Sequence, residues 1–213
     1  MSQDYILSKD YFINVIKDLI NLAEGKRDYF TDLDSAIGDG DHGLNLSIGF
    51  REVNKNLETW SVENLTTLFK KVGMALLSKV GGSAGPLYGS FFMKFGDPAN
   101  GKDEVNFEEF FNMFKVAVES VESRGKAVVG EKTMVDTLRP ALDAFEKAIQ
   151  EGLAPKEAFG KCLEAAKAGA DSTVPLIATK GRAMRLGERA IGHMDPGAAS
   201  STAFIETFYN RLP

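Results

Sequence analysis

Apolar residues recur at helical spacing through nearly all of this chain, and that periodicity limits its possible folds more than any other feature. Residues 8–24 place Phe12, Val15, Ile16 and Leu19 on one face, and Gly25 follows as a stop signal. No segment has the strict alternation of a half-buried strand. Further helices are predicted over residues 44–57, 88–95, 106–123, 134–149, 155–170 and 198–212, with a short one that ends near Leu33 and a longer one that follows Ser61 and runs into Gly81-Gly82.

The helix-boundary residues support this assignment. Ser61 is the expected N-cap of the helix that runs to Gly81, Asn106 and Glu109 have the spacing of a capping box, and Pro155 suits a first helical turn. Residues 173–196 carry glycines and basic residues with little periodicity. About eight helices with short connections predict an all-α, closed antiparallel barrel or bundle, with loops gathered at its two ends. At 213 residues, we expect a single domain over 1–213.

The stretch DSAIGDGDHGLN (34–45) concentrates carboxylates among glycines. Asp34, Asp39 and Asp41 fall within a few residues of one another, and the glycines allow the sharp turns that would bring them together. Hard oxygen ligands without cysteine favour Mg²⁺, Ca²⁺ or Mn²⁺ over Zn²⁺. The alternative is an acidic glycine turn that binds nothing.

Several familiar motifs are excluded. GDGDHG has the G-x-G-x-x-G form, but a helical pattern precedes it where a dinucleotide site requires a strand. An EF-hand loop that began at Asp39 would have Phe50 where a bidentate Glu belongs. Neither a P-loop nor the protein-kinase motifs occur. A metal-bridged phosphate site is the interpretation that remains.

Three other stretches are candidates for the same site, since every second connection of an antiparallel bundle lies at one end. Residues 81–89 form a glycine-rich turn that opens a helix and could bind an anion, or could be a plain turn. His42 could donate to a phosphate, or be an exposed loop histidine. The other two stretches are the connections at residues 125–136 and 173–197, which we expect at the same end of the bundle. The 173–197 stretch contains four basic residues, which form either a lid over a phosphate or a solvated face: Lys180, Arg182, Arg185 and Arg189.

The charge balance limits the partners. A net charge of −5 and a pI near 5.2 argue against nucleic acid and against anionic membranes. The single Cys162 excludes an internal disulfide. The sequence shows neither a signal peptide nor an apolar run that could span a bilayer, so we expect a cytoplasmic protein.

Taken together, these stretches resemble the ADP-binding L subunit of the phosphotransferase-system-dependent dihydroxyacetone kinase. The matching motifs are GDGDHGLN (38–45), KVGGSAGPLYG (79–89), SRGKAVVGEKTMVD (123–136) and KGRAMRLGERAIGHMDPGA (180–198). They span most of the chain in the family's order. The nucleotide-binding half of single-chain, ATP-dependent dihydroxyacetone kinases is similar too.

The resemblance implies an eight-helix antiparallel barrel with ADP (or ATP) at one end. By that likeness Asp34, Asp39 and Asp41 ligate two Mg²⁺ ions. The implied nucleotide-binding residues are His42, Gly43, Leu44, Asn45, Ser83, Ala84, Gly125, Met134, Arg182, Asp195, Pro196 and Gly197. No catalytic side chain is implied. The bound ADP would receive phosphate from a phospho-histidine partner subunit and pass it to dihydroxyacetone on another subunit.

The chain departs from the family pattern at two places. Ser83-Ala84 stands where the family has Ala-Ser, and Met184-Arg185 replaces a Ser-Tyr pair. These changes bear on the phosphate contacts. Two alternative functions also stay open. One is the nucleotide domain of an ATP-dependent kinase for dihydroxyacetone or a related short ketose, and the other is a non-enzymatic protein that binds nucleotide and metal for regulation.

Overall fold

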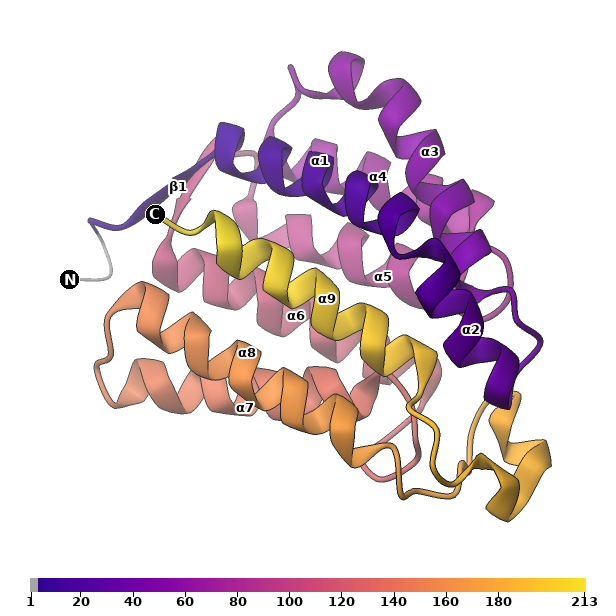
Figure 1. Ribbon diagram of the computed structural model, residues 1–213. Coiled ribbons are helices and arrows are strands. Elements are labelled where there is room, and N and C mark those ends of the chain that lie inside the picture. Colours follow the sequence, from indigo (N-terminus) through magenta and orange to yellow (C-terminus); the bar gives the residue numbers. More distant parts are fainter. Residues whose placement is uncertain (1–3) are drawn as a thin grey trace.

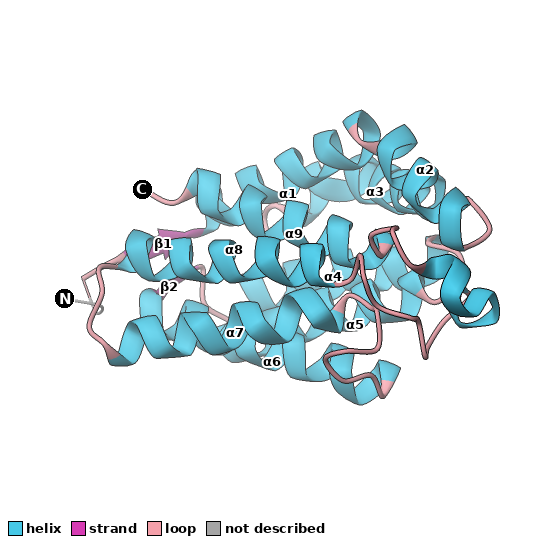
Figure 2. Ribbon diagram, turned by 60° about the horizontal axis from the view of Figure 1, so that its bottom comes forward, coloured by secondary structure: helices cyan, strands magenta, loops and turns pink. Residues whose placement is uncertain are grey.

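Nine α-helices make up most of residues 4–213, the part of the chain that this computed structural model describes (Figures 1 and 2). In chain order they are α1 (Lys9–Gly25), α2 (Arg27–Ile37), α3 (His42–Trp60), α4 (Leu65–Lys79), α5 (Ala84–Gly96), α6 (Phe107–Gly125), α7 (Val135–Gln150), α8 (Pro155–Ser172) and α9 (Pro196–Arg211). Two short 3₁₀ segments, η1 (Asp97–Ala99) and η2 (Ala183–Ala190), lie in the connections. The predicted helical fold class is confirmed.

The expectation that the chain has no strands was wrong. Strand β1 (Ile6–Ser8) pairs antiparallel with β2 (Glu104–Asn106), and Leu7 lies opposite Val105. Three residues are too few to show an alternating pattern, which is why the sequence did not reveal them. Each strand leads directly into a helix, because Ser8 caps α1 and Asn106 caps α6. The pair therefore fixes the starts of two helices that are far apart in sequence.

The helix boundaries confirm two predicted caps and correct a third. Asn106 and Glu109 form a complete capping box, and Pro155 is the first residue of α8. Ser61, however, is not the cap of α4. Asn64 has the extended backbone of an N-cap, and its side chain accepts a hydrogen bond from the Thr67 amide at 2.9 Å.

Helices that follow one another in the chain pack against each other, and the last helix, α9, contacts both α8 and α1. The shared interior is rich in phenylalanine. Phe110 is fully buried, with its ring centroid 5.2 Å from that of Phe159 and 6.1 Å from that of Phe95. Most of these rings meet edge to face, the geometry that aromatic quadrupoles favour. Burial of each ring contributes about 2 kcal/mol, so the aromatic core carries much of the fold's stability.

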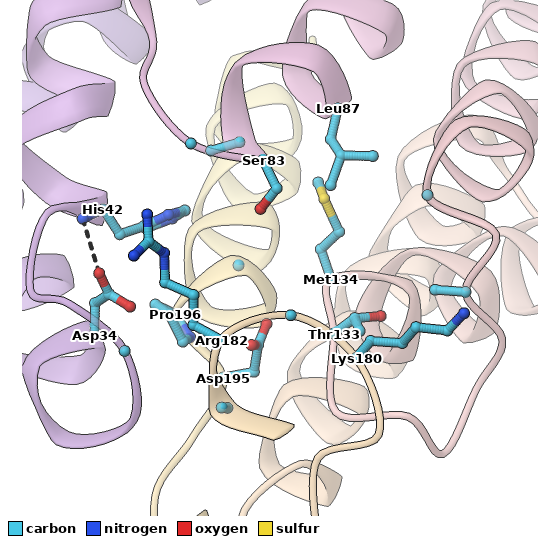
Figure 3. Close-up of a pocket in the computed structure, with 18 of the residues that line it drawn as sticks. Asp34, His42, Ser83, Leu87, Thr133, Met134, Lys180, Arg182, Asp195 and Pro196 are labelled. Atoms are coloured by element: carbon cyan, nitrogen blue, oxygen red, sulfur yellow. Dashed lines mark hydrogen bonds between the residues drawn. The ribbon is translucent and has the colours of Figure 1, made fainter. Parts of the chain in front are cut away.

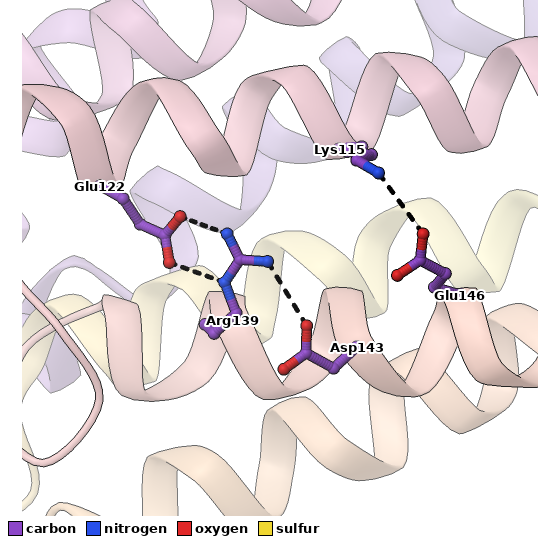
Figure 4. A network of polar contacts seen from close by, with 5 residues as sticks. All are labelled: Lys115, Glu122, Arg139, Asp143 and Glu146. Atoms are coloured by element: carbon purple, nitrogen blue, oxygen red, sulfur yellow. Dashed lines mark hydrogen bonds and ion pairs between the residues drawn. The ribbon is translucent and has the colours of Figure 1, made fainter.

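Ion pairs join α6 to α7 on the outer surface (Figure 4). Arg139 of α7 binds both carboxylate oxygens of Glu122 on α6 and also reaches Asp143, 3.4 Å away. Lys115 and Glu146 form a second bridge between the same helices. The pairing with Glu122 raises the pKa of Arg139. These contacts hold the end of α6 near the start of α7.

The two ends of the molecule differ. In Figure 1 the C-terminus lies at the end that carries β1, whereas η2 lies at the opposite end, beside α2. Among residues 4–213, no helix combines the length and apolar character needed to cross a bilayer.

Candidate functional site

A cavity of about 360 Å³ opens at the η2 end, large enough for a small ligand (Figure 3). All four stretches that the sequence placed at one rim contribute to its walls, so their predicted convergence is confirmed. The cavity lies between the end of α2, the starts of α3, α5 and α9, the link from α6 to α7, and the segment around residues 180–183.

The three aspartates meet on one wall. One carboxylate oxygen from each of Asp34, Asp39 and Asp41 lies within 4.8 Å of the others. Asp34 is in the last turn of α2, because that helix runs to Ile37 and not, as predicted, to about Leu33. Its Oδ2 accepts hydrogen bonds from the Asp41 amide at 2.9 Å and the His42 amide at 3.1 Å. The amides at the start of α3, those of its N-cap Asp41 and of His42, thereby fix the Asp34 carboxylate, and all three aspartates line the cavity.

The charge around this group fits a cation. Arg182 reaches across from the 180–183 segment, with Nη1 2.9 Å from Asp39 Oδ2, and supplies one positive charge against three carboxylates. Burial raises the pKa of Asp41, and the carboxylates of Asp39 and Asp34 add to that rise. Clustered hard oxygen donors with excess negative charge are the donor set that Mg²⁺ prefers. The residues present therefore fit a divalent metal.

The opposite wall is suited to an anion. The Gly81–Ser83 turn leads into α5, a helix whose first amides point outward and carry partial positive charge. A side chain at Gly81 would come within 2.8 Å of the Asn45 amide group, and Gly82 has a positive φ of 63°. The backbone conformation favours glycine at position 82, and a side chain at position 81 would displace the Asn45 amide group.

Beyond the turn the cavity becomes apolar. Leu87 and Met134 face one another in Figure 3, and Gly125 lies close enough that an added Cβ would be 3.2 Å from Leu87 Cδ2. Lys180 and Thr133 lie at the polar edge of this region. A flat apolar group such as a nucleobase matches this slot, with polar groups available at its rim.

The start of α9 completes the cavity. Asp195 is the N-cap of this helix and accepts a hydrogen bond from the Ala198 amide at 2.8 Å, and Pro196 and Gly197 follow it at the wall. Burial, and secondarily the nearby Asp136 carboxylate, raises the pKa of Asp195 to about 7. Its carboxylate therefore holds its proton to a higher pH than an exposed aspartate does.

His42 is half-buried, so the alternative of an exposed loop histidine was wrong. Its Nε2 lies 2.8 Å from Ser200 Oγ, which also contacts the Tyr88 hydroxyl at 2.6 Å. Burial lowers the pKa of His42 to about 4, against the opposing effect of Asp34. The ring is thus a neutral group in a chain of hydrogen bonds to α9.

Two of the residues predicted to bind nucleotide do not line the cavity, namely Gly43 and Leu44. Gly43 packs against α2, where an added Cβ would lie 1.9 Å from the Arg27 carbonyl oxygen, so its role is in helix packing. Leu44 is 46% exposed. Their place in a contiguous motif obscured the helical turn, which rotates neighbouring residues to different faces.

The remaining predicted residues all lie at the cavity wall, and the structure adds others that sequence reasoning did not assign to the site. Chief among these are Leu87, Tyr88, Lys132 and Thr133. Lys180, one of the basic residues that the sequence offered as a lid, also lies at the wall. Nothing in the sequence separates a side chain that lines a pocket from one that packs in the core.

Comparison with known proteins agrees with this geometry. The family model described as "DAK2 domain" matches residues 36–210. The chain is 51% identical over 211 residues to "PEP-dependent dihydroxyacetone kinase 2, ADP-binding subunit DhaL" of Listeria innocua, covering 98% of this chain and 97% of that one. It is 38% identical to the "PEP-dependent dihydroxyacetone kinase, ADP-binding subunit DhaL" of Escherichia coli, covering 91% and 92%.

These matches define a DAK2-domain protein. Within that class, the chain belongs to the DhaL family, as the sequence motifs predicted.

Solved structures support the fold. The dihydroxyacetone kinase of C. freundii matches with a TM-score of 0.69 at 24% identity, over 93% of this chain and 34% of that one. The form of that enzyme in complex with AMP-PNP and Mg²⁺ matches with a TM-score of 0.66 over 93% of this chain and 33% of that one.

Proposed function

We propose that this chain is the nucleotide-carrying subunit of a dihydroxyacetone kinase. Its bound ADP would accept phosphate from a phospho-histidine subunit and pass it to dihydroxyacetone held on another subunit in the cytoplasm. The observation that carries the proposal is one cavity that joins a carboxylate cluster, a helix N-terminus and an apolar slot. The sequence match to ADP-binding subunits, which covers nearly the full length of both chains, supports the proposal.

Each wall has a role in this proposal. Asp34, Asp39 and Asp41 would hold Mg²⁺, with two ions by family likeness. When bound, Mg²⁺ supplies the charge neutralisation that phosphoryl transfer requires. The α5 N-terminus with Ser83 and Ala84 would receive the diphosphate.

The remaining walls would hold the rest of the nucleotide and shield it. Gly125 and Met134, together with Leu87, would enclose the base. Arg182 would cover the phosphates, and the 195–197 turn would close the remaining side and exclude water that would hydrolyse the carried phosphate. We infer that the helices form a closed barrel and that residues 1–213 act as one domain, because α9 contacts both α8 and α1.

A direct test is to denature the purified, gel-filtered protein and identify the nucleotide released. Stoichiometric ADP supports the carrier role. An empty protein that binds added ATP reversibly supports instead the ATP-dependent kinase for a short ketose. Absence of phosphorylated ketose from both phosphoenolpyruvate and ATP, after reconstitution with the partner subunits, would favour a regulatory binding protein.

A further inference from the structure

A lid segment, defined here as residues 175–191, covers one side of the cavity. It contains η2 and brings Lys180 and Arg182 to the cavity wall. Its far side is held by a small apolar cluster around Ile37 of α2, and Arg182 reaches the Asp39 carboxylate. The lid leaves the helical bundle through two chain ends, 173–174 and 192–195, which we call the neck.

The two segments of the neck lie side by side. The Gly192 amide donates to the Val174 carbonyl at 2.9 Å, and the Asp195 amide donates to Thr173 Oγ1 at 3.0 Å. Because these hydrogen bonds join the two segments of the neck, we expect the lid to move as a unit about it.

Lys132 lies in the link between α6 and α7 and contacts both segments of the neck. Its Nζ donates to the Thr173 carbonyl at 2.5 Å and to the His193 carbonyl at 2.5 Å, and it lies 3.5 Å from the Val174 carbonyl. One ammonium group therefore joins the chain entering the lid to the chain leaving it.

The environment of Lys132 is unusual for a lysine. The residue is 1% exposed, and it has a left-handed backbone with φ of 61°. A buried ammonium requires acceptors for its protons, and here the neck carbonyls are those acceptors. Burial lowers the pKa of Lys132, while the Asp195 and Asp136 carboxylates oppose that shift. Removal of the ammonium would leave the neck carbonyls without these hydrogen bonds.

We propose that Lys132 is a positioning residue that clamps the neck of the lid and so sets how slowly bound nucleotide leaves. The inference rests on the proposed function, because a lid over an ADP carrier must stay closed between phosphoryl transfers. Thr133 and Met134, the next two residues, line the cavity. The clamp thus connects the lid to the wall that would contact the nucleotide.

The test compares Lys132→Met with Lys126→Met. Lys126 is exposed, belongs to the same link and also has a positive φ, of 48°, so the control carries the same backbone penalty without the clamp. Trypsin can cut the lid at Lys180, Arg182, Arg185 and Arg189. We expect lid cleavage of nucleotide-free K132M, and release of a fluorescent ADP analogue in Mg²⁺, to be about tenfold faster than in K126M.

The outcomes separate this inference from the proposed function. If the wild-type protein binds no ADP, the proposed function fails, and lid cleavage still tests the clamp. If ADP binds but K132M and K126M match in both measurements, the clamp is refuted. Lys132→Arg, which keeps the charge and the donors, should lie closer to wild type, and equal loosening in K132R would refute the hydrogen-bond argument.

A second variant covers the case in which K132M does not fold. Thr173→Val removes the acceptor for the Asp195 amide at the same neck and keeps the shape of a buried residue. We expect faster lid cleavage in T173V, and cleavage at the wild-type rate would overturn the role given to the neck.

Discussion

Replacement of Asp39 by Asn separates metal binding from folding. The Asp39 side chain is 34% exposed, and its salt bridge is with Arg182, whose side chain is 58% exposed. Solvent-exposed pairs of this kind contribute about 0.5 kcal/mol, and the change also relieves repulsion from two neighbouring carboxylates. The ligand-free variant should therefore unfold within about 2 °C of wild type, a shift that a chain of this size shows for about 0.5 kcal/mol.

The ligand-bound proteins should differ far more. At a ligand concentration about 100 times its Kd, bound nucleotide stabilises the native state by about 2.7 kcal/mol. In a chain of this length that corresponds to a rise in Tm of about 5–10 °C. Mg²⁺ requires a nearly complete oxygen shell, so Asp39→Asn should lose most of the rise.

The assay is thermal denaturation with Mg²⁺ and ADP, and again with a chelator. Asp32→Asn is the matched control, because Asp32 is an exposed aspartate on α2 away from the cavity. Asp34→Ala should show both effects: besides removing a carboxylate of the proposed metal site, it removes the acceptor for the Asp41 and His42 amides and should destabilise even the ligand-free protein by about 2 kcal/mol. A wild-type rise in Tm for Asp39→Asn would refute the metal-bridge reasoning.

Three further predictions concern other parts of the structure. The folded-state pKa of Asp195, about 7, exceeds its ordinary value, so the native state binds the extra proton and ligand-free stability should fall as pH rises from about 4 to 7. Between pH 5 and pH 8, chemical denaturation should show a loss of about 2.5 kcal/mol in wild type relative to Asp195→Asn, which keeps the helix cap. Equal pH profiles would contradict this. Gly43→Ala should destabilise by about 2 kcal/mol, since its Cβ would clash with the Arg27 carbonyl, and an unchanged Tm would show that α2 and α3 can separate without cost. Arg139→Met should cost about 1 kcal/mol through loss of the partly buried pairing with Glu122, and urea titration should place that loss in wild type but not in a Glu122→Gln background.

Helix positions and the family were readable from sequence because both depend on local patterns. Apolar spacing marked the cores of the long helices, and the capping box at Asn106 fixed the start of α6. The α2 boundary was misplaced because α2 continues through polar residues to Ile37, past the point where apolar spacing ends. The β1–β2 pair was missed because pairing across about a hundred residues leaves no mark on strands of three.

The sequence by itself determined the helical class, the three carboxylates and the stretches that meet at one end, since periodicity, glycine spacing and ligand chemistry are properties of neighbouring residues. Only the tertiary structure decided which of those residues face the cavity. Gly43 packs against α2 instead of lining the cavity, and His42 is partly buried against α9. The tertiary structure also placed Lys132 between the two segments of the neck, which are more than forty residues away in sequence. The reason is that the packing of the helices sets where a side chain points and whether it is buried.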